Sequence, residues 1–74
     1  MNETNLKRLR QYRKAIQTMR KSRELVAKTD CQGDITLEQV TKEIVERIDI
    51  NIMVLERRSS MISREMMHSE MASL

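Results

Sequence analysis

Few residues of this 74-residue chain have the types and spacing that could support chemistry. Glu65 and His68 form a Glu-x-x-His pair, a spacing that places two metal ligands on one face of a helix. A di-metal site of this kind also needs facing carboxylates on another helix, and only Glu24 is available in the second half of the N-terminal segment. The sequence therefore predicts no metal site and no bound cofactor.

Nucleophilic and phosphate-binding chemistry are also poorly supported. Cys31 is the single cysteine, which excludes an internal disulfide, and it has no histidine close to it in sequence. One glycine cannot build a glycine-rich phosphate loop. We expect a protein that is not an enzyme and that takes no small-molecule substrate.

A row of cations is one candidate for a binding function. Lys7, Lys14, Lys21 and Lys28 recur every seven residues, with Arg10 beside them, so on a helix the lysines stand roughly 10 Å apart along one line. Such a row could follow a nucleic-acid backbone, although it could equally be the solvated side of a helix. No aromatic side chain lies on this line to stack bases, so paired RNA or DNA would be the ligand.

Charge is segregated along the chain. Residues 1–30 hold nine Lys or Arg against three acidic residues, a net of +6, and residues 31–74 hold five against eight, a net of −3. The overall charge of +3 is too small to identify a partner. Opposite charges would help the two halves of the chain to pair as helices.

Apolar residues recur at spacings of three and four, which predicts an all-α, two-helix antiparallel hairpin. We expect a first helix over about residues 3–29, a loop over about 30–35 that contains the only glycine, Gly33, and a second helix over about 36–70, all within one unit spanning 1–74. The residues expected to form the seam between the helices are Leu9, Tyr12, Ile16, Met19, Val26, Val45, Ile48, Ile52, Leu55 and Ile62.

The start of the second helix carries three local signals. Thr36 as the N-cap would form a capping box with Gln39, and Ile35 and Val40 would form a hydrophobic staple. The segment 48–52 alternates Ile with polar residues, which is typical of a strand. We predict a helix there because the helical spacing continues through it, with a strand that pairs across a dimer as the alternative.

A core of this composition is marginal for a single chain. Hydrophobic residues make up 39% of the sequence, but Phe and Trp are absent and Tyr12 is the only aromatic residue. A two-helix hairpin also leaves apolar surface uncovered. We therefore expect a homodimer that forms a four-helix bundle, or a hairpin that completes the fold of a different protein.

The second helix has more apolar residues than one seam requires. Ile50, Met53 and Val54 lie off the main stripe, and methionine, which repacks easily, is frequent near the C-terminus. We predict a surface that binds a protein partner, although the methionines could instead fill an irregular bundle end. Its residues are Ile50, Met53, Val54, Met61, Met67 and Met71.

The length and layout resemble two families of helical hairpin. The Rop family of plasmid copy-control proteins dimerises into four-helix bundles and binds paired RNA loops, which implies a dimeric RNA- or DNA-binding regulator that uses the lysine row. The hairpin co-chaperones of type III secretion needle proteins imply a chaperone that covers an aggregation-prone helix. No apolar run approaches the roughly 20 residues of a membrane span and no secretory signal pattern opens the chain, so we expect a cytoplasmic protein.

Overall fold

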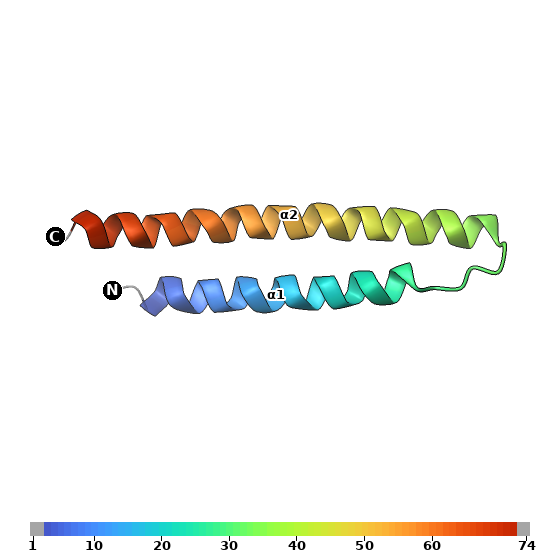
Figure 1. The fold of residues 1–74 in the computed structure, drawn as a ribbon, viewed down its shortest axis with the longest axis horizontal. Coiled ribbons are helices and arrows are strands. Elements are labelled where there is room, and N and C mark those ends of the chain that lie inside the picture. The colour runs from blue at the N-terminus through green and yellow to red at the C-terminus, as the bar shows by residue number, and fades with distance from the viewer. Residues whose placement is uncertain (1–2, 73–74) are drawn as a thin grey trace.

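The fold consists of two long antiparallel helices in a computed structural model that describes residues 3–72, with side chains described over 3–68. Helix α1 spans Glu3–Ala27 and helix α2 spans Ile35–Ala72 (Figure 1). The described residues contain no strand, and segment 48–52 lies within α2. The chain is therefore an all-α hairpin, and the strand alternative for this segment is wrong.

The two helices meet along the predicted seam. All ten residues assigned to it from the sequence are buried or half-buried. The most deeply buried are Leu9, Ile16, Ile52 and Ile62, and Ile62 has no exposed surface (0%). In each helix these residues follow a three-and-four spacing, so one narrow stripe of each helix faces the other.

Two polar residues interrupt the seam, Arg23 in α1 and Ser59 in α2, and both are half-buried. Arg23 turns to the side of the seam, where its Nε donates to Asp49 Oδ1 at 2.5 Å and its Nη2 donates to Asp49 Oδ2 at 3.3 Å. This hydrogen bonding and the carboxylate charge raise the pKa of Arg23 above its ordinary value. A charged group is thus accommodated at a seam position because its head reaches a partner at the edge.

A second ion pair joins α1 to α2. Arg20 Nη2 donates to Glu56 Oε1 at 2.5 Å, one turn along α1 from the Arg23–Asp49 pair. All four side chains are between 43% and 62% exposed, so water screens both pairs and their contribution to stability is modest. The two ion pairs instead help to set the register of α1 relative to α2, since each joins one position of α1 to one position of α2.

The connection between the helices is a tight turn. Asp34 N donates to Cys31 O at 2.8 Å, and the two central residues have positive φ angles, 50° for Gln32 and 78° for Gly33. These angles define a type I′ turn, which suits glycine at both central positions or asparagine before glycine. Asp30 Oδ1 supports the turn by accepting from Gln32 N at 3.1 Å. Gly33 meets this requirement freely, whereas Gln32 is strained.

Helix α2 begins at a different residue from the one predicted. The N-cap is Asp34, whose Oδ1 accepts from Leu37 N at 3.1 Å and whose carbonyl accepts from Glu38 N at 2.9 Å. The Thr36 cap is therefore wrong, because a carboxylate two residues earlier already satisfies the free amides. Ile35, at 71% exposed, is the first helical residue and does not form the predicted staple with Val40.

The helices differ in length, with 25 residues in α1 and 38 in α2. Helix α1 ends at Ala27, two residues before its predicted end. Just beyond it, Thr29 N donates a hydrogen bond to Val26 O at 3.1 Å. Figure 1 shows α2 extending beyond α1 at both ends, with the loop lying beside its N-terminal turns. The molecule measures 61 × 15 × 12 Å, so it is essentially as long as α2.

The seam predicts a large effect of a buried charge. Ile52→Asp should lower the free energy of unfolding by several kcal/mol, because Ile52 is 8% exposed and a carboxylate would be buried in the apolar seam. Asn51→Asp introduces the same side chain one residue earlier on the exposed surface and should change stability by less than about 0.5 kcal/mol. Thermal unfolding followed by circular dichroism compares them, and equal stability of the two variants would refute the seam.

The turn predicts opposite effects of one substitution at two positions. Gln32→Asn should raise the free energy of unfolding by about 0.5–1 kcal/mol, because asparagine adopts a positive φ more readily than glutamine. Gln39→Asn, on the exposed surface of α2, should lower it by a few tenths of a kcal/mol, because asparagine is the poorer helix former. Urea unfolding measures both, and destabilisation at residue 32 would contradict the assigned turn.

Candidate interaction surface

Helix α2 has a second apolar surface that does not touch α1. We call this surface the outer face of α2, and every residue in it is between 41% and 60% exposed. Its residues are Val40, Ile44, Ile50, Met53, Val54 and Met61. They extend along about six turns of the helix, so the outer face is nearly as long as the seam itself.

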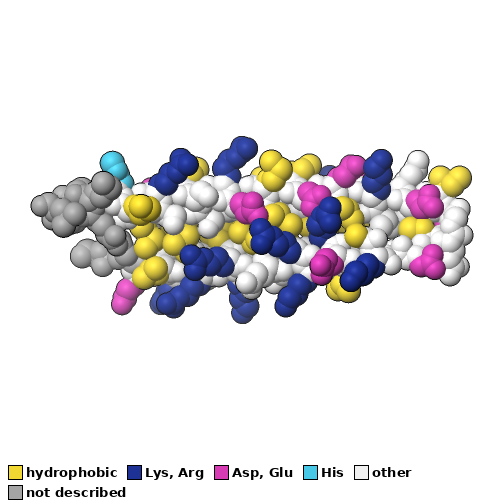
Figure 2. Space-filling view, viewed as in Figure 1, with side chains coloured by type: hydrophobic (Ala, Val, Ile, Leu, Met, Phe, Trp, Pro, Cys, Tyr) yellow, Lys and Arg dark blue, Asp and Glu magenta, His cyan; other side chains and the backbone are white. Residues whose placement is uncertain are grey.

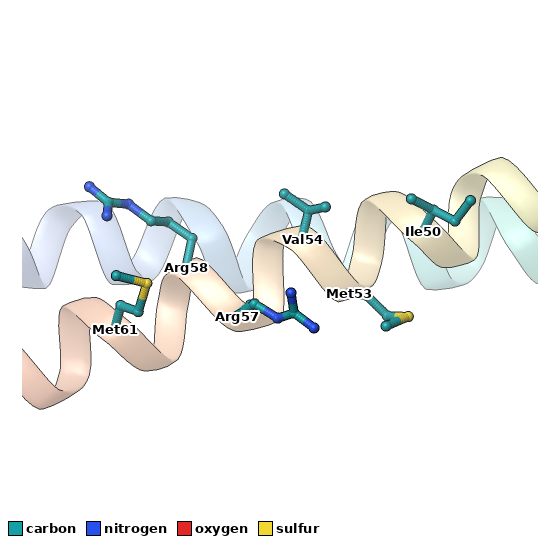
Figure 3. A pocket seen from close by; sticks show the side chains of 6 residues that line it. All are labelled: Ile50, Met53, Val54, Arg57, Arg58 and Met61. Carbon is teal, nitrogen blue, oxygen red and sulfur yellow. The ribbon is translucent and has the colours of Figure 1, made fainter.

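The outer face lies on the side of α2 opposite to α1. Ile50 and Val54 stand two residues before and two residues after the buried Ile52, which places each about 200° around the helix from it. Figure 3 shows that the labelled side chains all come from α2, with α1 behind that helix. Helix α2 therefore has apolar residues on two opposite sides, whereas the seam stripe is the main apolar surface of α1.

Two shallow hollows lie end to end on the outer face and share Ile50. The first, of about 440 Å³, is lined by Ile50, Met53, Val54, Arg57, Arg58 and Met61 (Figure 3). The second, of about 380 Å³, is lined by Val40, Glu43, Ile44, Glu46, Arg47 and Ile50. Both are open on one side, as expected of surfaces that a neighbouring helix could fill.

The two hollows differ in the charge at their rims. Arg57 and Arg58 border the C-terminal hollow, whereas Glu43 and Glu46, with one Arg47, border the N-terminal hollow. Figure 2 shows apolar side chains along the α2 edge, with Lys and Arg side chains on the C-terminal side of them. Going along α2, the outer face therefore changes from mainly acidic to basic at Ile50.

The structure brings together four of the six residues predicted to bind a partner. Ile50, Met53, Val54 and Met61 line one hollow. Met67 is exposed but lies outside both hollows, and Met71 falls where side chains are not described. That these residues bind a partner stays a prediction, because their position alone does not test it.

Sequence reasoning missed Val40 and Ile44. Val40 had been assigned to the staple and Ile44 to no role, yet both lie on the outer face with 46% and 41% exposure. The signal was the spacing of four between them, which continues six residues later at Ile50 and then at Val54. The outer face is thus a broad second apolar surface along about six turns of α2, from Val40 to Met61, rather than a local cluster.

The basic row on α1 is placed as its spacing required. Lys7, Arg10, Lys14 and Lys21 are exposed on α1, and Lys28 lies just past its end. Among the residues with described side chains, none of these five forms an ion pair, in contrast to Arg20 and Arg23. The row is therefore free to meet anionic groups from outside the chain (Figure 2).

The remaining candidates for chemistry stay apart from one another. Glu65 and His68 are exposed, and within residues 3–68 no group of three metal-ligating side chains comes together. Cys31 Sγ is half-buried between the loop and α2, 3.7 Å from Thr29 O and 3.9 Å from Thr41 Oγ1. Its contacts place this thiol where it closes the loop end of the seam.

Comparison with known protein families, with curated proteins and with solved structures finds no match for the chain. Neither α1 nor α2, over the residues described, combines the length and apolar character needed to cross a membrane.

Proposed function

We propose that the protein is a non-enzymatic interaction module of the regulator, adaptor or chaperone class, which binds a helix of another polypeptide through the outer face of α2. The observation that supports this proposal is the second apolar stripe, exposed along about six turns. Apolar patches of that extent on a soluble chain mark interaction sites. On this proposal Met67, which is 62% exposed, continues the binding surface beyond the hollows.

The large accessible surface area of the chain supports the proposal that a partner binds to it. The hairpin exposes 6432 Å² of accessible surface. A compact monomer of 8.8 kDa exposes about 4,800 Å², so the hairpin leaves an excess of about 1,600 Å². One partner of a standard interface buries about 800 Å². The uncovered area is thus large enough for a full interface, even though part of it is due to the elongated shape.

The shape of the outer face suits a helix as the occupant. Val40 and Ile44, and Ile50 and Val54, are each four residues apart, so their side chains form ridges with grooves between them, into which the ridges of a second helix fit. Methionine at positions 53 and 61 adapts to an irregular neighbour. On this proposal two hairpins, or a hairpin and two helices of another protein, form a four-helix assembly.

A second candidate function is regulation by nucleic-acid binding, in the manner that the likeness to the Rop family implies. It is favoured by the exposure of Lys7, Arg10, Lys14 and Lys21 and by the lack of ion pairs to them among the described side chains. The row lies on α1, away from the outer face of α2. Nucleic acid and a protein partner could therefore bind together.

Site-specific photo-crosslinking tests the primary proposal. A photoreactive phenylalanine analogue at residue 54, in the cells that make the protein, should give a protein adduct of defined mass, because Val54 lies at the centre of the outer face. The same analogue at Lys14, exposed on α1, should not give that adduct. Ile50→Glu should abolish the adduct at residue 54, and an adduct that survives this change or forms equally at residue 14 would refute the proposal.

A mobility-shift assay with duplex RNA and DNA tests the second candidate. Lys14→Glu with Lys21→Glu should abolish binding, whereas Lys42→Glu, the same charge change on α2, should have little effect. If five cations contact phosphates, the affinity for duplex DNA should fall about 500-fold between 50 and 200 mM salt. Binding that is insensitive to both the salt and the α1 changes would exclude the row as the site.

A further inference from the structure

We propose that the occupant of the outer face is a second copy of this chain, with α2 of one protomer antiparallel to α2 of its partner and a twofold axis close to Ile50. This inference rests on the proposed function, for which it names the partner. It follows from a property of the outer face that an arbitrary partner would not require, namely that the face is complementary to itself when its direction is reversed.

The charges carry the first part of this argument. Glu43 lies seven residues before Ile50 and Arg57 lies seven residues after it, so the three share one line along α2. Reversal of the helix about Ile50 places Glu43 of each protomer opposite Arg57 of the other. The twofold axis repeats this pair. In the same register Arg58 falls one residue from Glu43 of the partner, and Glu46 falls three residues from its Arg57, so the mainly acidic end of each outer face lies along the basic end of the other. A parallel pair would instead bring like charges together.

The apolar residues repeat the same symmetry. Val40 lies ten residues before Ile50 and Met61 lies eleven after it, so reversal brings these two together at both ends of the outer face. Near the axis, Arg47 falls opposite Met53, where the aliphatic part of the arginine can cover the methionine while its head stays in water. In this arrangement the hollow of about 440 Å³ on one protomer lies against the hollow of about 380 Å³ on the other.

The position of the outer face determines the form of the dimer. A closed four-helix bundle requires the two apolar sides of each helix to stand roughly at right angles, so that each helix contacts two neighbours around a shared core. In α2 the second side is opposite to the first, as Ile50 and Val54 show relative to Ile52. The dimer is therefore an open layer of four helices in the order α1, α2, α2, α1, which differs from the closed bundle expected from the sequence.

Charge reversal tests both the partner and its direction. Wild-type chain should sediment at twice 8.8 kDa. Glu43→Arg with Glu46→Arg should weaken the dimer at least about tenfold in Kd, and so should Arg57→Glu with Arg58→Glu, since each change opposes like charges across the axis. The four changes combined in one chain should restore the wild-type Kd. Glu24→Arg, a matched charge change on the exposed surface of α1, should leave it unchanged.

Mixing the two double variants supplies the control for folding. All four altered side chains are exposed and face away from α1. If a double variant alone loses helicity because its monomer is marginal, the 1:1 mixture should regain both the helicity and the mass of a dimer. Sedimentation equilibrium and circular dichroism on the same samples provide the two readouts.

Each remaining outcome overturns the inference. A wild-type chain that is helical but monomeric at high concentration would exclude the second copy, and a double variant that dimerises as tightly as the wild type would exclude the charge pairing. A four-change chain that stays monomeric would exclude the antiparallel direction. The primary proposal fails separately: an adduct at residue 54 with a different protein keeps the interaction module and rejects self-association, whereas the absence of any specific adduct rejects both.

Discussion

Two packed helices can bury only one stripe of side chains on each helix, and this restricts how much apolar surface the chain can remove from water. A chain without Phe or Trp must make that stripe mainly from aliphatic residues and methionine, and over residues 3–68 only Leu9, Ile16, Ile52 and Ile62 are buried. The remaining apolar residues of α2 have no place in the seam, so they stay on the surface. The outer face, the large accessible area and the expectation of a partner all follow from this shortage of interior.

The charged residues have two distinct roles on the two sides of α2. At the edge of the seam, Asp49 and Glu56 take Arg23 and Arg20 of the same chain, and these pairs set the register of the hairpin. On the outer face, among the described side chains, the charges form no ion pair with α1, and in the proposed dimer their order along the helix distinguishes one direction of association from the other. Ion pairs of modest strength therefore select among arrangements that apolar contact alone would allow equally.

The seam was predictable from the sequence because a buried stripe of a helix repeats apolar residues at spacings of three and four. This repeat is still recognisable although Arg23 and Ser59 each replace one of its apolar residues. The cap was not predictable in the same way. Asp and Thr are both favourable N-cap residues. Asp34 is the cap because the turn through Gln32 and Gly33 ends there, so the helix begins at the next residue.

The outer face was half predictable. Ile50, Met53 and Val54 are recognisable in the sequence because they lie outside the stripe of residues that forms the seam. Val40 and Ile44 precede Val45, the first predicted seam residue of the second helix, so the sequence does not show that they lie outside the seam. Their exposure depends on which side of α2 faces α1, and at this level of the helix the half-buried Val45 and Ile48 determine that side.

The distribution of burial along the hairpin determines how the chain can fold. Contacts beside the loop close first, because the loop between them is shortest and its closure costs the least entropy. Yet the seam near the loop holds Arg23 and the half-buried Val26 and Ile48, while Leu9 and the fully buried Ile62 lie toward the open end. The chain must therefore close most of its length, past a strained turn, before its best packing is gained. Folding should accordingly have a late transition state in which both helices are already aligned.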